Sequence, residues 1–231
     1  MPRVIVFDVN ETLLDLKALD AHFDRVFRAP GVRKEWFKQM LQSALLTTIL
    51  DAYSEFGAVG ASALEMTAAV HDVVLTEDDR KAILGGMREL PPHPEVPVAL
   101  RRLHEAGLRL CALTNSTQAV AEAQLEHAGL TGYFERILSA DTVRRLKPHA
   151  AVYQMAARAC GVEPDALRLV AVHSWDVAGA LRAGCAAAFV ARPGMAINPL
   201  FGQPDIVGAD LAAVAEAVLA SDGPRQPIAR G

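Results

Sequence analysis

A short apolar run that ends at a carboxylate places the strongest constraint on the fold. Val4, Ile5, Val6 and Phe7 are followed at once by Asp8. Such a run is typical of a strand buried on both faces of a parallel sheet. In open α/β sheets the ligand crevice lies at the carboxyl ends of the strands. The pattern therefore predicts that Asp8 faces this crevice, where it can be a nucleophile, a metal ligand or a structural cap.

Composition excludes several classes of protein. The 231 residues are 52% hydrophobic and 22% charged, which suits one or two soluble domains with a sizeable core. The formal net charge of −4 and the lack of a basic block argue against a nucleic-acid partner. No apolar run approaches the length of a membrane span. Because the N-terminus has a strand pattern and not that of a signal segment, we expect no membrane partner and a cytoplasmic location.

Three cysteines are scattered along the chain. Their spacing matches neither a metal site nor a disulfide framework, so we expect them to be small core residues in a reducing compartment. They are Cys111, Cys160 and Cys185.

Strand and helix patterns alternate through most of the chain. This alternation predicts an α/β fold, a Rossmann-like open parallel sheet with helices on both faces. After the first strand, the expected strands cover residues 108–114, 136–139, 167–172, 187–191 and 206–207. The expected helices cover residues 118–127, 148–160, 176–183 and 210–220.

Residues 16–90 have a different texture. They are rich in Ala, Leu and Met, with few strand signals, and predict an all-helical cap inserted after the first strand, with breaks at 57–62 and 76–79. The latter break has the pattern of a helix start. We therefore assign residues 1–15 and 91–221 to a Rossmann-like core domain, 16–90 to the cap and 222–231 to a mobile tail.

Four short segments follow the ends of successive strands. They run from Phe7 to Leu13, Leu113 to Ser116, Leu146 to Pro148 and His173 to Ala180. In order and spacing they resemble the four motifs of the haloacid dehalogenase superfamily, and the resemblance covers essentially the whole chain. The likeness is greatest to the hydrolytic (S)-2-haloacid dehalogenases of type II, because of Ser174-Trp175-Asp176 and the context of Lys147.

Most members of this superfamily are magnesium-dependent phosphatases, and two positions test that activity. Phosphatases carry a second aspartate two residues after the nucleophile, but position 10 is Asn10, which has no proton to give at neutral pH. They also carry an acidic metal ligand four residues before the later aspartate, where this chain has Val172. A phosphatase-like hydrolase and a non-catalytic member of the fold remain the alternatives. The preferred interpretation needs no metal and no cofactor.

The resemblance implies hydrolytic dehalogenation of short 2-haloalkanoic acids, with a halide as the second product. Asp8 would attack the halogen-bearing carbon with inversion at C2, forming an aspartyl ester that water hydrolyses to a 2-hydroxy acid. Lys147 would keep Asp8 ionised, and Asp176 would pair with Lys147 and orient the water. As purely structural alternatives, the two aspartates would cap local structure and Lys147 would be an exposed side chain.

Further residues are assigned to substrate binding by the same resemblance. Thr114 would hold the substrate carboxylate together with the backbone N–H groups of Val9 and Asn10, and Asn115 would face the halide. Trp175 matches a residue of the family's pocket. The structural alternatives are a helix-capping turn for Thr114 and Asn115, and a plain core position for Trp175.

The cap matches the family less well. Members use an arginine early in the cap to receive the halide, and Arg33 is the best candidate by position, with Arg25 and Arg28 as competitors. Phe37 and Met40 lie on the helical face of Arg33, where they would either close a pocket or pack on neighbouring helices. The apolar cap segments between residues 41 and 74 are compatible with a homodimer.

Several positions depart from the familiar dehalogenases. Asn10 replaces a tyrosine, Glu11 a glycine, and His173 an asparagine, while Ala171 stands where a serine is usual. Our hypothesis is that His173 and Glu11 form a dyad that activates the hydrolytic water. In the competing interpretation His173 is structural and Asp176 alone handles the water.

Overall fold

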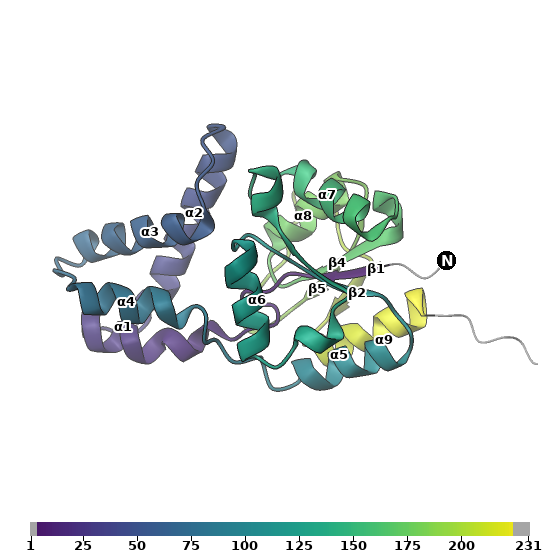
Figure 1. The fold of residues 1–231 in the computed structure, drawn as a ribbon, viewed down its shortest axis with the longest axis horizontal. Coiled ribbons are helices and arrows are strands. Elements are labelled where there is room, and N and C mark those ends of the chain that lie inside the picture. The colour runs from purple at the N-terminus through teal and green to yellow at the C-terminus, as the bar shows by residue number, and fades with distance from the viewer. Residues whose placement is uncertain (1–3, 224–231) are drawn as a thin grey trace, which may run out of the picture.

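The computed structural model describes residues 4–223. One sheet of six parallel strands, in the order β3-β2-β1-β4-β5-β6, forms its centre (Figure 1). The chain leaves β1 for β2 on one side and later returns to β4 on the other, so the strand order reverses at β1. The predicted Rossmann-like fold is confirmed. The strands are β1 (Val4–Phe7), β2 (Leu110–Thr114), β3 (Arg136–Ser139), β4 (Leu167–Ala171), β5 (Ala186–Val190) and β6 (Ile206–Gly208).

Helices cover both faces of the sheet (Figure 1). Side chains alternate along β1, so Ile5 and Phe7 pack in one apolar cluster while Val4 and Val6 pack in the other. One face holds α5 (Val96–Glu105), α6 (Gln118–His127) and α9 (Leu211–Asp222), and the other holds α7 (Ala150–Cys160) and α8 (Ser174–Arg182). Short 3-10 turns lie at η1 (Leu16–Leu19), η2 (Thr131–Tyr133), η3 (Ala140–Val143) and η4 (Pro164–Ala166).

All helices of the segment predicted as the cap come before α5. They are α1 (Asp20–Phe27), α2 (Val32–Ile49), α3 (Phe56–Val70) and α4 (Glu77–Gly86). The predicted helix start at Thr76 is confirmed by a capping box with Asp79. The predicted break at residues 57–62 is wrong, because α3 runs through it. A Cβ at Gly60 would lie 3.0 Å from Met40 Cε, so this glycine lets α2 and α3 pack closely.

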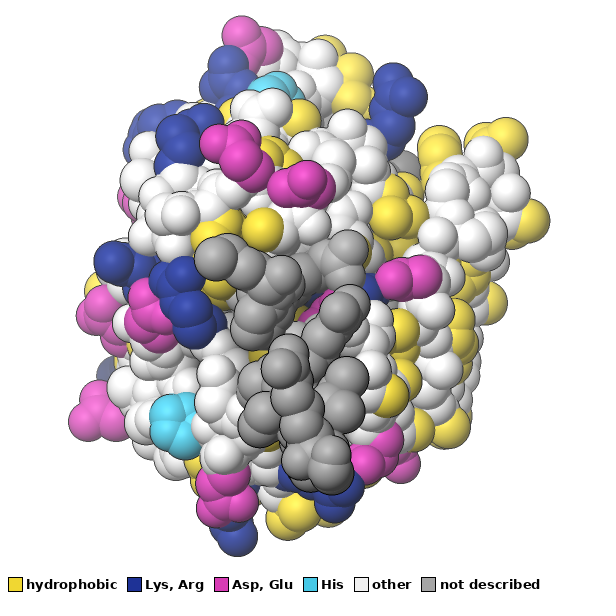
Figure 2. Space-filling view, turned by 90° about the vertical axis from the view of Figure 1, so that its right-hand side faces the viewer, with side chains coloured by type: hydrophobic (Ala, Val, Ile, Leu, Met, Phe, Trp, Pro, Cys, Tyr) yellow, Lys and Arg dark blue, Asp and Glu magenta, His cyan; other side chains and the backbone are white. Residues whose placement is uncertain are grey.

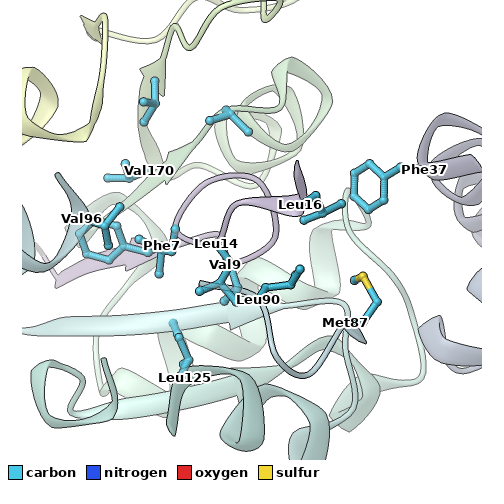
Figure 3. Packing of buried hydrophobic residues seen from close by; sticks show 14 of the residues in the cluster. Phe7, Val9, Leu14, Leu16, Phe37, Met87, Leu90, Val96, Leu125 and Val170 are labelled. Carbon is cyan, nitrogen blue, oxygen red and sulfur yellow. The ribbon is translucent and has the colours of Figure 1, made fainter. Parts of the chain in front are cut away.

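The chain leaves the sheet for these helices and returns along adjacent paths. Asp15 N donates to Pro91 O over 2.8 Å, and His93 N donates to Leu13 O over 2.9 Å. Side chains of the core and of the helical segment share one buried cluster (Figure 3). The labelled members include Phe7, Val9, Leu14, Leu16, Phe37 and Met87.

Several helix boundaries differ from the predicted ones by one or two residues. The helix predicted from residue 148 begins at Ala150, because the Nδ1 atom of His149 caps it by accepting the N–H of Ala151. The last helix continues to Asp222, which is buried and bonds to the fully buried Arg168. Residue 222 therefore belongs to the core rather than to the predicted tail, and residues 224–231 of that tail lie outside the described residues.

The surface and the cysteines add further observations. On the face shown in Figure 2, both signs of charge are interspersed. Within residues 4–223, no helix combines the length and apolarity that crossing a membrane requires.

All three cysteines are buried and free, with Cys111 Sγ 3.4 Å from Cys160 Sγ. Large apolar side chains such as Ile49 and Val74 are exposed on the helical segment, and the homodimer stays a prediction.

The close approach of α8 to α7 generates a stability prediction. A Cβ at Gly179 would lie 2.5 Å from Pro148 Cβ and 2.6 Å from Tyr153 Oη. Gly179→Ala should therefore lower the free energy of unfolding by about 1–3 kcal/mol through overpacking. Gly57→Ala is the matched control, since its Cβ would meet nothing within 4 Å. It should leave the stability unchanged or raise it by up to about 1 kcal/mol. Urea unfolding measures the free energy of unfolding of both variants. Equal changes in Gly179→Ala and Gly57→Ala would contradict the prediction.

Candidate active site

Polar side chains gather where three neighbouring strands end. Asp8 follows β1, Thr114 ends β2, and His173 follows β4. Lys147 precedes α7, and Asp176 lies in the first turn of α8. All of these residues except Asp176 line one small pocket. Its lining residues are Asp8, Asn10, Phe37, Leu41, Phe56, Thr114, Asn115, Lys147, His173 and Trp175.

The Lys147 ammonium lies between the two aspartates. Its Nζ donates to Asp8 Oδ1 over 2.7 Å, to Asp176 Oδ2 over 2.6 Å and to Leu113 O over 3.1 Å. Its three protons therefore all have acceptors. Burial disfavours the charge, but the charges of Asp176 and Asp8 outweigh it and raise the pKa of Lys147. This buried cation holds two carboxylates together at the bottom of the pocket.

Asp8 is held ionised by its neighbours. Thr12 Oγ1 donates to Asp8 Oδ2 over 2.6 Å and itself accepts the N–H of Val172. Burial opposes ionisation of Asp8, yet the Lys147 charge and the His173 hydrogen bond bring its pKa well below the ordinary value. A deprotonated carboxylate at neutral pH is the form that a nucleophile needs.

The pKa of Asp176 is shifted in the opposite direction to that of Asp8. Burial and the nearby charge of Asp8 raise its pKa, against the pull of Lys147 and of Tyr153. Tyr153 Oη donates to Asp176 Oδ1 over 2.5 Å, and burial raises the pKa of this phenol. Of the two carboxylates that share Lys147, Asp8 therefore ionises more readily. Tyr153 and Lys147 together fix the orientation of Asp176.

The residues of the predicted dyad are in contact. His173 Nε2 lies 2.9 Å from Glu11 Oε2, and His173 Nδ1 lies 3.2 Å from Asp8 Oδ2. Glu11 reaches this position from a left-handed backbone conformation, with φ 62°, which is uncommon for residues other than glycine. The Trp175 ring stacks on the imidazole with 5.1 Å between centroids.

The charge of His173 follows from these contacts. Both ring nitrogens face carboxylates, which only accept hydrogen bonds, so both bonds form together only in the imidazolium. Burial disfavours that cation, but the hydrogen bonds to Asp8 and Glu11 raise the pKa of His173 to about 9. In the free protein at neutral pH His173 is thus a second cation beside Asp8, and it has no free nitrogen to take up a proton.

Two side-chain amides point donors toward the pocket. Asn115 Oδ1 accepts the N–H of Lys147 over 2.8 Å, and Asn10 Oδ1 accepts Gln124 Nε2 over 3.1 Å. With their oxygens engaged, these two pocket-lining side chains retain NH₂ groups for an anion. Thr114 also lines the pocket, and its hydroxyl accepts the N–H of Ser116.

The remaining predicted residues divide into two groups. Phe37 and Trp175 line the pocket, whereas Met40 lines a neighbouring cavity. Val9 packs in the core cluster, and its carbonyl accepts the N–H groups of Leu13 and Leu14. The structure thus brings most of the predicted site together. Met40 does not line the pocket, and the role of the Val9 backbone N–H in binding the substrate carboxylate stays a prediction.

Arg33 is not in the pocket, contrary to the sequence-based prediction. Its Nε donates to Asp20 Oδ1 over 2.6 Å, and its Nη1 lies 4.0 Å from Glu11 Oε1. It lies one turn before Phe37, but these two carboxylates draw its guanidinium away from the pocket. Of the competitors, Arg25 pairs with Asp79 and Arg28 is exposed. In the part of the chain that the structure describes, no arginine lines this pocket.

Sequence reasoning missed five residues of the site. Thr12 lies four residues after Asp8 in the first motif, and this spacing is the one signal that could have found it. The other four lie on four different helices: Leu41, Phe56, Gln124 and Tyr153. They have no local motif, and only the packing of those helices brings them to the site.

Comparison with known proteins identifies the family. Residues 2–184 match the sequence model of the haloacid dehalogenase-like hydrolases. This chain belongs to that family. It is therefore a hydrolase by family, as the sequence predicted.

Individual members of the family resemble this chain along most of its length. It is 31% identical over 216 residues to the (S)-2-haloacid dehalogenase of Pseudomonas sp. (strain YL), covering 92% of each chain. It is 29% identical over 207 residues to haloacetate dehalogenase H-2 of Moraxella sp. (strain B), covering 88% of this chain and 92% of that one. The L-2-haloacid dehalogenase from Xanthobacter autotrophicus, solved with chloropropionic acid covalently bound, shares the fold with a TM-score of 0.88. Its identity to this chain is 24%, and the match covers 96% of this chain and 100% of that one.

Because His173 is charged in the folded protein, the free energy of unfolding should depend on pH. Because its pKa rises from 6.5 to about 9 on folding, its contribution is fully present below pH 6.5 and is lost as the pH rises through 9. The difference in unfolding free energy between wild type and His173→Gln should fall by about 3 kcal/mol over this range. Urea unfolding at a series of pH values measures it.

His93 should affect the pH dependence of stability in the opposite direction. Burial and the charge of Arg192 lower its pKa, so it disfavours the folded state at acidic pH. The difference in unfolding free energy between wild type and His93→Gln should therefore increase as the pH rises through the acidic range. If both differences followed the same trend, the imidazolium assignment would be wrong.

Proposed function

We propose that this chain is a metal-independent dehalogenase that converts short 2-haloalkanoic acids to 2-hydroxy acids. The observation that carries the proposal is the ionised Asp8, buried beside Lys147 at the bottom of a small pocket. The relatives named as haloacid dehalogenases support the substrate class. A halide leaves without needing a proton, which suits a pocket whose position 10 is an amide.

The first step is displacement at C2. A carboxylate oxygen of Asp8 attacks the carbon from the side opposite the halogen, an aspartyl ester bond forms, and the halide leaves with the bonding electrons. The configuration at C2 is inverted. We assign the NH₂ groups of Asn10 and Asn115 to the two anionic ends of the substrate, its carboxylate and its departing halide, because no arginine of the described chain reaches the pocket.

The second step is hydrolysis of the ester, and here we assign the base to His173. Esterification removes the charge of Asp8, one of the two groups that hold His173 protonated. The imidazolium then releases a proton to solvent. Water attacks the ester carbonyl carbon and His173 takes one proton of the water. The acyl C–O bond then breaks, and the departing alkoxide oxygen takes the second proton of the water. The products are the hydroxy acid and the original pair of Asp8 carboxylate and His173 imidazolium.

The groups around Asp8 favour this chemistry over phosphoryl transfer. Asn10 stands where a phosphatase would need a second aspartate to protonate the leaving alkoxide. Val172 stands where the divalent cation of a phosphatase would need an acidic ligand. In residues 4–223, no cluster of three His, Cys, Asp or Glu side chains has the geometry of a metal site.

Halide release tests the overall reaction. Wild type should release chloride from at least one enantiomer of 2-chloropropionate equally with and without EDTA, forming lactate of inverted configuration. A single turnover in ¹⁸O-water should place ¹⁸O in Asp8 and not in the lactate, because the product oxygen comes from the carboxylate. Asp8→Asn, a near-isosteric control, should lose the activity by at least about 10³-fold. Label found only in the lactate, or a magnesium requirement, would rule the proposal out.

Removal of His173 tests the second step. His173→Ala should slow turnover by about 10²–10⁴-fold while the ester accumulates, which intact-protein mass spectrometry detects. Glu11→Gln, which keeps the size of the side chain but removes its charge, should show a smaller effect in the same direction. Unchanged turnover in His173→Ala would instead assign the water to Asp176.

A further inference from the structure

A larger cavity adjoins the site pocket. It has a volume of about 310 Å³, compared with about 10 Å³ for the pocket. Its walls come from α2, α3 and α4 on one side and from the start of α6 on the other. The apolar part of the lining consists mainly of Trp36, Met40, Phe56, Leu84, Met87 and Val120. We call this cavity the cap cleft.

Phe56 is the residue that the linings of the cap cleft and the pocket share. It is the first residue of α3 and is 4% exposed. The two cavities are also neighbours along the chain. Asn115 lines the pocket while Ser116 and Thr117 line the cleft, and Leu41 lines the pocket while Met40 lines the cleft. The linings of the two cavities therefore meet at the Phe56 side chain.

We propose that the cap cleft is a subsite for the alkyl chain at C2 of medium-chain 2-haloalkanoic acids, and that Phe56 determines which chain lengths reach it. This inference rests on the proposed dehalogenation. The anionic groups of the substrate belong with the amides and cations of the pocket. The alkyl chain is the one part of such a substrate that can extend past Phe56.

The lining of the cap cleft suits an unbranched apolar chain. Trp36 and Met40 on α2 are both buried, and methionine side chains adapt to the shape of a ligand. The charged lining residues, Glu55 and Arg88, are exposed, so the buried wall offers no partner to a charged chain end. Each methylene that moves from water to such a wall improves binding by about fourfold.

The test compares 2-bromopropionate with 2-bromohexanoate, which has three more methylenes. Wild type should prefer the shorter acid. Phe56→Ala, with Phe56→Leu as the milder change, should raise the ratio of kcat/KM for hexanoate over propionate at least about tenfold. Phe37→Ala is the matched control, because Phe37 lines the pocket but not the cleft. It should not raise this ratio.

Filling the cap cleft should reverse the increase in the ratio of kcat/KM for hexanoate over propionate. Val120 lies on α6, is half-buried and lines only the cleft. Phe56→Ala combined with Val120→Phe should return the ratio to the wild-type value, while bromoacetate turnover stays that of Phe56→Ala alone. A gain that persists in the double variant, or no gain in either Phe56 variant, would overturn the subsite.

The two tryptophans of the chain allow a measurement without turnover. Trp36 lines the cleft and Trp175 lines the pocket. In Phe56→Ala with Trp175→Phe, hexanoate should change the emission of Trp36 and acetate should not. In Phe56→Ala with Trp36→Phe, both acids should change the emission of Trp175. If hexanoate leaves Trp36 unaffected, the subsite is wrong.

These measurements separate the two proposals. If no variant releases bromide from bromoacetate while hexanoate still changes the Trp36 emission, the dehalogenation fails and the subsite for an alkyl chain stands. If bromoacetate is turned over and chain length has no effect on any Phe56 variant, the dehalogenation stands and the subsite fails.

Discussion

The ion contacts of Lys147 hold the site together. A buried ammonium between Asp8 and Asp176 is stable because each of its protons has an acceptor and both carboxylates are close. Removing one member of such a buried group would leave an uncompensated charge, which typically costs about 3–5 kcal/mol. The three residues come from the end of β1, the segment before α7 and the start of α8. The same contact that prepares the nucleophile therefore also ties three parts of the core together.

His173 adds a second, conditional cation to this arrangement. Lys147 contacts two buried carboxylates, and esterification of Asp8 would leave it paired with Asp176. His173 has Asp8 and the half-exposed Glu11 as partners, so its charge depends directly on that of Asp8. The pocket thus combines one fixed positive charge with one that follows the state of the nucleophile. Glu11 is itself placed by its backbone, whose carbonyl contacts His93 Nε2 at 3.0 Å.

The sequence predicts the core of the site better than its outer wall, for a physical reason. Asp8 and His173 follow the ends of neighbouring strands, and in a parallel sheet such ends meet at one edge whatever the details of packing. The position of Arg33 depended instead on which carboxylate its flexible side chain would meet, and Asp20 is 13 residues away in another helix. The helix through Gly57 and Gly60 likewise depended on contacts with α2 that local propensity does not contain.

The way in which the helical segment joins the sheet has a wider consequence. Its two ends lie side by side and are hydrogen-bonded to each other between Asp15 and Pro91 and between Leu13 and His93. The helical segment therefore starts and ends at the same place on the core, and its length does not affect the packing of the sheet. A fold connected in this manner can exchange one covering module for another, longer or shorter, and so acquire new ligand preferences while the reacting groups beneath keep their places.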